Sequence, residues 1–219
     1  MRRELLAELL GSALLAATVI GSGIMAERMA AGNGAIALLA NTLATCGALY
    51  ALITVLGPVS GAHFNPLVSI AMLTEKALSG AACISYVVTQ FIGMFLGMML
   101  AHAMFGLPLV QASQHTRSGT GIWLSEIVAS FALLLVIMGC LRQKLPAAGA
   151  VAATIGAGYW FTSSTSFANP AITAARAFTD TFAGIRPSDA LPFVVAQVAG
   201  ALLAIGIARV VFPPLTLRR

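Results

Sequence analysis

The second half of this chain repeats the first. Three segments recur in the same order, with matching glutamate, asparagine, glutamine and glycine residues. The aligned pairs are AELLGSALL (7–15) with SEIVASFAL (125–133), FNPLVSIAM (64–72) with ANPAITAAR (168–176), and YVVTQFIGMFL (86–96) with FVVAQVAGALL (193–203). The repeat predicts one domain over 1–219 made of two homologous halves, about 1–106 and 121–212, joined by 107–120.

Most of the chain is apolar. Apolar residues make up 59% of the sequence and charged residues 9%, too few charges to cover the surface of a water-soluble protein of this size. Stretches near the ~20 residues that cross a bilayer as a helix recur at about 5–26, 35–56, 81–105, 122–141, 147–164 and 190–212. Each half holds three of them, so the second half starts from the opposite face. The sequence therefore predicts an all-α membrane protein with six transmembrane helices in an inverted repeat.

The basic residues predict the orientation. Placing the N-terminus in the cytoplasm puts eight of the twelve basic residues at the inner side: Arg2, Arg3, Lys76, Arg142, Lys144, Arg209, Arg218 and Arg219. Arg28, Arg117, Arg176 and Arg186 then lie at the outer side. This bias is typical of cytoplasmic loops and predicts that both termini are cytoplasmic. The net charge of +5 thus indicates topology and no nucleic-acid partner. A cleaved signal peptide is the alternative for the N-terminus, although Glu8 interrupts its apolar core.

The two Asn-Pro pairs predict short helices. Asn is favoured as a helix N-cap and Pro at the first helical position, so each pair indicates a helix start. The segments 66–74 and 170–178 each hold nine residues, about 14 Å of helix against about 30 Å of hydrocarbon. We therefore expect two re-entrant half-helices whose N-termini meet at the midplane. Two ordinary turns in surface loops are the alternative.

Such a meeting point has a definite polarity. Each helix N-terminus presents partial positive charge and unsatisfied N–H donors, and the Asn65 and Asn169 amides add donors. This arrangement favours the oxygen of a neutral solute and opposes cations, protons included. The leading prediction is thus a passive channel for small uncharged solutes.

The Asn-Pro segments also resemble the two signatures of the aquaporin and glycerol-facilitator family, the major intrinsic proteins. SGAHFNPLVS (60–69) is similar to the first signature and SFANPAITAAR (166–176) to the second. The resemblance implies a pore in every protomer and a homotetramer embedded in membrane lipid. It places the pore centre at Asn65, Pro66, Leu67, Asn169, Pro170 and Ala171, with Leu67 bulkier than the usual Ala.

The resemblance fails at the family's selectivity filter. Ile172 occupies the position of the usual filter arginine, and ungapped spacing assigns the other filter positions to Thr45, Ala157 and Ser166. These residues predict a wide ring without an aromatic side chain or a guanidinium. Together with NPAITAARAFTDTFAGI (169–185), they resemble a bacterial branch associated with arsenic resistance. That association implies a bacterial inner membrane and neutral metalloids such as arsenite or methylated arsenicals, besides glycerol and water.

The nearest cation follows one helical turn later. Arg176 is four residues beyond Ile172, about 6 Å further out, and its side chain leans back toward the filter. We assign it to the outer vestibule as a relocated filter cation. The alternative is a structural Arg176–Asp180 pair at helical spacing.

Two intramembrane carboxylates, Glu8 and Glu126, allow two hypotheses. Their symmetric placement fits acceptors for the N–H groups of the re-entrant loops, a supporting role that we also assign to His63. Intramembrane carboxylates also serve as proton relays, so a proton-coupled secondary transporter is a competing hypothesis. A water-selective channel is another.

No pattern indicates catalysis, a metal or a cofactor. Cys46, Cys83 and Cys140 have no metal-ligand spacing, and the three histidines are scattered. The sequence lacks a nucleophile–base or paired-carboxylate arrangement, so we expect no enzyme.

Overall fold

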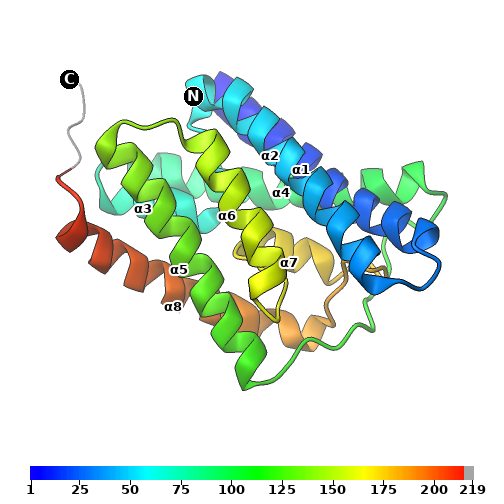
Figure 1. The fold of residues 1–219 in the computed structure, drawn as a ribbon. Helices are drawn as coiled ribbons and strands as arrows, with labels where there is room; N and C mark the ends of the chain where they lie inside the picture. The colour runs from blue at the N-terminus through cyan, green and yellow to red at the C-terminus, as the bar shows by residue number, and fades with distance from the viewer. Residues whose placement is uncertain (215–219) are drawn as a thin grey trace.

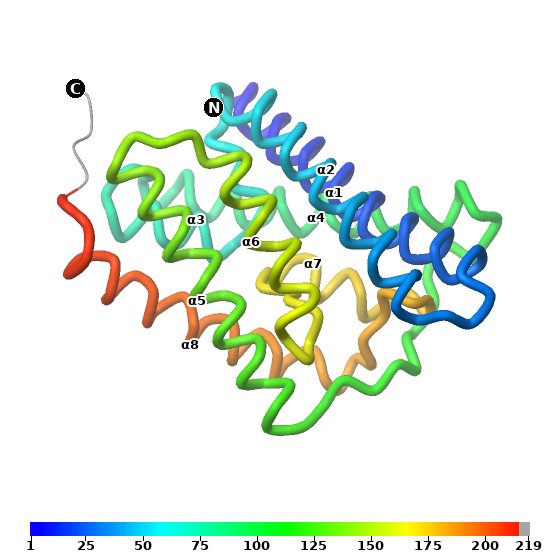
Figure 2. Tube along the Cα trace, in the orientation of Figure 1, coloured from blue at the N-terminus to red at the C-terminus, as the bar shows by residue number. Residues whose placement is uncertain are grey.

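The computed structural model describes residues 1–214 and folds into helices (Figures 1 and 2). Arg218 and Arg219, two of the predicted inner-side cations, lie outside the described residues. The helices are α1 (Arg2–Met29), α2 (Gly34–Ser60), α3 (Pro66–Thr74), α4 (Gly80–Met104), α5 (Thr120–Gln143), α6 (Ala147–Phe161), α7 (Pro170–Arg176) and α8 (Pro187–Val211). Two short helices among longer ones match the predicted fold class.

Five of these helices are long and apolar enough to cross a membrane. The sixth expected span, 147–164, is shorter than expected, because α6 has 15 residues, or about 22 Å. The helix stops where Thr162 takes an extended conformation, with φ −109° and ψ 139°. From there the chain turns back toward α7.

The first four helices and the last four make corresponding contacts. Helix α1 packs along α4 as α5 packs along α8, and α2 covers α1 as α6 covers α5. Helices α2 and α6 also pack on each other, and α7 lies among the long helices in the centre of the bundle (Figure 1). Glycine lets the pairs approach closely, since a Cβ on Gly93 would lie 2.7 Å from the Leu9 carbonyl oxygen.

The two half-helices meet at their N-termini. The Asn65 carboxamide oxygen accepts from Leu67 N at 2.9 Å, and that of Asn169 accepts from Ala171 N at 3.0 Å, so each asparagine caps its own helix. Each amide nitrogen crosses to the other segment. Asn65 Nδ2 donates to Ala168 O and Asn169 Nδ2 donates to Phe64 O, both at 2.8 Å. These reciprocal bonds join the two segments.

Helix α7 ends at Arg176, two residues before the expected Phe178. The carbonyls of the next two residues accept from the linker between the halves. Ser113 N donates to Ala177 O and Gln111 N to Phe178 O, each at 3.0 Å. The α-helical pattern ends here because Ala177 N donates to Ala174 O and Phe178 N to Ala175 O, three residues back and not four.

The backbone before each asparagine is strained. Phe64 and Ala168 both have φ +47°, in the left-handed region that favours glycine. Ala62 and Ser166 are also left-handed, with φ +49° and +53°. Such a conformation costs on the order of 1 kcal/mol or more per residue, so surrounding contacts must hold it.

Buried carboxylates supply those contacts. Glu8 accepts from His63 N at 2.9 Å and Phe64 N at 2.8 Å, and also from the side chains of Ser60 and Gln90.

Glu126 does the same in the second half. It accepts from Phe167 N at 2.9 Å, Ala168 N at 3.0 Å and the Gln197 side chain at 2.7 Å. Both carboxylates thus hold the left-handed turns that lead into the half-helices. His63 also contributes, with its Nδ1 3.0 Å from Ser69 Oγ.

We predict that Glu126→Gln destabilises the fold, because an amide presents one oxygen and an NH₂ group where two backbone N–H donors converge. Leaving a buried donor unpaired costs about 1–3 kcal/mol, which corresponds to a fall in the unfolding temperature of roughly 5 °C. Thermal unfolding in detergent measures the change, with the exposed Glu27→Gln as the control. Equal unfolding temperatures for the two variants would show that the Glu126 contacts do not stabilise the turn.

Candidate functional site

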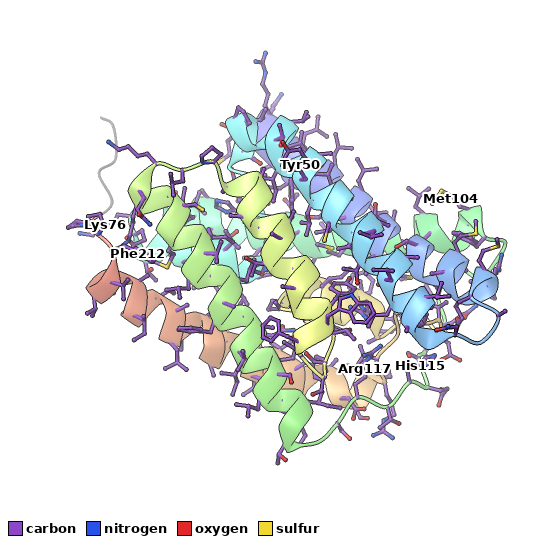
Figure 3. The ribbon with its side chains drawn as sticks, in the orientation of Figure 1. Tyr50, Lys76, Met104, His115, Arg117 and Phe212 are labelled. Carbon is purple, nitrogen blue, oxygen red and sulfur yellow. The ribbon has the colours of Figure 1, made fainter. Side chains whose placement is uncertain are left out.

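A cavity of about 370 Å³ passes between the two half-helices. Its lining begins beside Leu78 after α3, passes Asn65 and Asn169, and reaches Arg176 at the end of α7. Its walls come from α1, α2, α5, α6 and the two re-entrant segments, and Tyr86 of α4 adds one side chain. In Figure 3, Lys76 and Phe212 lie at one end of the molecule, and His115 and Arg117 lie near the opposite end.

The predicted pore-centre residues separate into two groups. Asn65 and Asn169 line the cavity, and each uses one amide hydrogen for the bond across to the other segment. The second amide hydrogen of each is left for the lumen. The other four residues, Pro66, Leu67, Pro170 and Ala171, are buried outside the lining. Leu67 is 1% exposed and packs in the hydrophobic core, so its bulk does not narrow the cavity.

The lining combines an apolar surface with a polar stripe. Aliphatic side chains supply most of it: Leu15, Val19, Leu49, Ile53, Val68, Met72, Leu133, Ile137, Leu141, Val151 and Ile155. The polar stripe consists of the two asparagine side chains and those of Ser60, His63 and Ser166 in the re-entrant segments before them. A neutral solute with hydroxyl groups can therefore exchange hydrogen bonds on one side while its remaining surface contacts hydrocarbon.

Three of the four predicted filter residues meet at the outer part of the cavity, and one does not. Thr45, Ser166 and Ile172 line it, but Ala157 is exposed on the outside of α6. Its place is taken by Tyr159, which is 4% exposed and has its hydroxyl 3.3 Å from Thr45 Oγ1. We call Thr45, Tyr159, Ser166 and Ile172 the outer ring.

Helix periodicity explains the error at Ala157. Val151, Ile155 and Tyr159 are four residues apart and share the face of α6 that lines the cavity, which turns Ala157 away. Ungapped spacing from Asn169 assumes a fixed loop length after α6 and misses this face. The outer ring accordingly contains an aromatic side chain, contrary to the sequence-based expectation.

Arg176 lines the outer end of the cavity. It is 5% exposed, its Nε donates to Ala183 O, and its guanidinium carbon lies 3.3 Å from the centroid of the Phe167 ring. Within residues 1–214, no other protein group accepts from this guanidinium, so its terminal nitrogens are left for the lumen.

The alternative pairing of Arg176 with Asp180 is not present. No ion pair joins the two side chains, and Asp180 Oδ1 instead accepts from Gln114 N at 2.8 Å. A guanidinium therefore stands at the mouth although Ile172 replaces the usual arginine.

Sequence reasoning missed Tyr159, Phe167 and Arg117 as residues of this region. Tyr159 could have been found from the sequence, because it continues the four-residue spacing of apolar residues on one face of α6. Phe167 and Arg117 carried none, since their positions depend on contacts between distant segments.

Comparisons with known proteins agree with this geometry. The profile of the family described as Major intrinsic protein matches residues 1–163. The chain is 47% identical to aquaglyceroporin AqpS of Rhizobium meliloti (strain 1021), over 98% of this chain and 92% of that protein. It is 32% identical to a probable aquaporin, AqpM, of Archaeoglobus fulgidus, over 72% of this chain and 70% of that protein.

A solved structure shares the fold. The X-ray structure of the aquaglyceroporin from Plasmodium falciparum superimposes with a TM-score of 0.70, covers 96% of each chain and is 21% identical in sequence. The fold is therefore the aquaporin fold, as the resemblance implied. With its paired half-helices and the cavity between them, this chain belongs to the major intrinsic protein family of membrane channels.

Proposed function

We propose that this chain is a passive channel for small uncharged solutes that excludes ions and protons. The observation that carries the proposal is the cavity between the half-helices, lined by Asn65 and Asn169 and bordered by Arg176. The relative from Rhizobium meliloti, named an aquaglyceroporin, supports solutes of the glycerol class.

Charge exclusion follows from the donors around the cavity. The N-terminal ends of α3 and α7 carry partial positive charge, and the asparagine amides direct hydrogens to the same place. Arg176 adds a full charge that no carboxylate neutralises by an ion pair in the described part of the chain. A cation must lose part of its hydration here, and it meets the positive ends of two helices and the charge of Arg176.

The outer ring supports hydroxylated solutes in particular. Thr45, Tyr159 and Ser166 supply hydroxyl groups, which both donate and accept hydrogen bonds. Glycerol and undissociated arsenite each present several hydroxyls to such a ring, and Ile172 offers the apolar contact suited to a methylated arsenical. We therefore propose glycerol, water and neutral metalloids as the permeating solutes.

One observation favours a water-selective channel as the second candidate. Tyr159 makes the outer ring narrower than the four small side chains expected from the sequence. A measurement of water and glycerol flux into proteoliposomes distinguishes these two functions.

The contacts of the buried glutamates argue against a proton-coupled transporter. Glu8 accepts four hydrogen bonds and Glu126 three, all from groups that shape the re-entrant turns. Protonating either one would remove acceptors from strained backbone. We propose that both are scaffold residues, with His63 in the same role.

The same proposal includes the organisation of the protein in the membrane. We propose one channel domain of two inverted repeats, about 1–106 and 121–212, assembled as a homotetramer in a bacterial inner membrane with both termini cytoplasmic. Exposed apolar side chains such as Leu43, Ile84 and Val195 support contact with lipid or with neighbouring copies. No catalytic activity or cofactor is part of this function.

Proteoliposome flux tests the function. In stopped-flow measurements we expect glycerol and arsenite to enter well above the rate of protein-free vesicles, while arsenate and methylammonium stay at background. Dissipating the proton gradient should leave the glycerol rate unchanged. Water flux with full exclusion of glycerol and arsenite would establish the water-selective channel, and sensitivity to an uncoupler would establish a transporter.

A second prediction concerns the role of Arg176. Arg176→Gln removes the charge from the lumen, so the ratio of methylammonium to glycerol permeability should rise about tenfold. Asp180→Asn is the matched control, because it keeps an acceptor for Gln114 N and should leave the ratio unchanged. The same ratio in Arg176→Gln and wild type would reduce Arg176 to a scaffold residue.

A further inference from the structure

The linker between the two halves is attached to the loop that follows α7. Two more hydrogen bonds join them besides those to Ala177 and Phe178. His115 O accepts from Arg186 N at 2.7 Å, and Gln114 N donates to the Asp180 carboxylate. These bonds fix the linker to the loop after α7, and Figure 3 shows the linker residues His115 and Arg117 close to each other at one end of the molecule. The position of Arg117 is therefore set by the fold.

The Arg117 guanidinium is bound at backbone carbonyls. Its Nε donates to Gly184 O at 2.7 Å, and its terminal nitrogens lie 3.3 Å from Phe182 O and 3.5 Å from Ser164 O. Arg176 donates to Ala183 O, so two arginines hold three consecutive carbonyls of one loop.

Both guanidiniums also share one aromatic ring. The Arg117 guanidinium carbon lies 5.2 Å from the centroid of Phe167, and that of Arg176 lies 3.3 Å from it. Phe167 lines the cavity next to Ser166 of the outer ring, whereas Arg117 does not line it. Arg117 is thus a cation immediately behind the cavity wall.

The nearby carboxylates do not neutralise these two charges. Asp189 accepts from the backbone N of Arg117 at 2.9 Å, but its ion pair is with Arg186 at 3.0 Å. Glu126 is occupied by the N–H groups of Phe167 and Ala168. Burial lowers the pKa of Arg117 and the Glu126 charge opposes that change, but an arginine stays protonated in proteins. Asp180, the third carboxylate of this region, accepts from Gln114 N, so in residues 1–214 none of the three carboxylates forms an ion pair with Arg117 or Arg176.

We propose that Arg117 is a specificity-determining residue of the channel: a second fixed cation that raises the barrier to cations at the outer ring from behind Phe167. It acts without touching the solute, through the field of its charge. The inference rests on the proposed function. The field reaches the cavity wall because the Arg117 guanidinium lies 5.2 Å from the ring centroid of Phe167, which lines the cavity, and this distance is within the screening length of about 8 Å at physiological salt.

The test separates charge from hydrogen bonding at position 117. Arg117→Gln removes the charge, and Arg117→Lys keeps the charge while losing most of the carbonyl bonds. Arg28→Gln is the matched control, because Arg28 also lies over an aromatic ring, 5.1 Å from the Phe105 centroid, and faces a backbone carbonyl, Phe105 O, at 3.4 Å. Arg28 is exposed and does not line the cavity.

Methylammonium and glycerol permeabilities are measured for each reconstituted variant. We expect Arg117→Gln to raise the methylammonium-to-glycerol ratio about tenfold, with Arg117→Lys and Arg28→Gln staying within twofold of wild type. A ratio unchanged in Arg117→Gln would overturn the proposal. A ratio raised equally in the Lys variant would also overturn it, because loop geometry and not charge would then set the selectivity.

The outcome is distinguishable from failure of the proposed function. If wild-type vesicles pass no neutral solute, the channel function fails before any variant is compared. If Arg117→Gln cannot be reconstituted, the Arg117→Lys channel tests the proposal instead. Cation exclusion retained in Arg117→Lys supports the role of the charge, and cation exclusion lost in it contradicts that role.

Discussion

Two buried carboxylates hold the backbone on which the remaining structure depends. A helix that begins inside a bilayer must be entered by non-helical chain, and non-helical chain needs partners for its N–H groups. Glu8 and Glu126 supply these partners at equivalent places, directly before Asn65 and Asn169. Their bonds keep the left-handed turns in place, and the turns bring the two asparagines to each other. Without the bonds to Glu8 and Glu126, the N-termini of α3 and α7 would lack a fixed position beside the cavity.

One end of the cavity is lined by a guanidinium, that of Arg176, although Ile172 occupies the position where the family resemblance expects an arginine. Ile172 leaves the inner position apolar, and Arg176 returns a guanidinium to the lining from one turn further along. Its position depends on Phe167 and on the loop at Ala183, because no carboxylate pairs with it in the described chain. Such an arrangement separates two tasks, with small hydroxyl and apolar groups at the ring and positive charge just outside it.

Local signals predicted the parts of the structure that depend on local chemistry. The Asn-Pro pair fixed the start of both half-helices, and the bounds of α3 agree with the expected segment because its capping is local. The end of α7 could not be found this way, since Arg176 O accepts from Ile185 N and the following residues bond to the linker, contacts that the local sequence does not show. Ala157 was misplaced because a filter position was carried over by counting residues across a loop. The face shared by Ile155 and Tyr159 would have corrected it. The place of Arg117 depends on its contacts with residues far away in the sequence, and no local pattern in the sequence predicts such contacts.

In the proposed function, neutral solutes cross through the cavity that Tyr159, and not Ala157, lines. Cysteine accessibility tests it most directly, in a background where Cys46, Cys83 and Cys140 are replaced by serine. Tyr159→Cys and Ala157→Cys channels are treated with a neutral aromatic methanethiosulfonate, and glycerol flux is measured before and after. We expect the reagent to abolish flux through Tyr159→Cys and to leave Ala157→Cys unaffected. Block of the Ala157→Cys channel with an unaffected Tyr159→Cys channel would contradict the account.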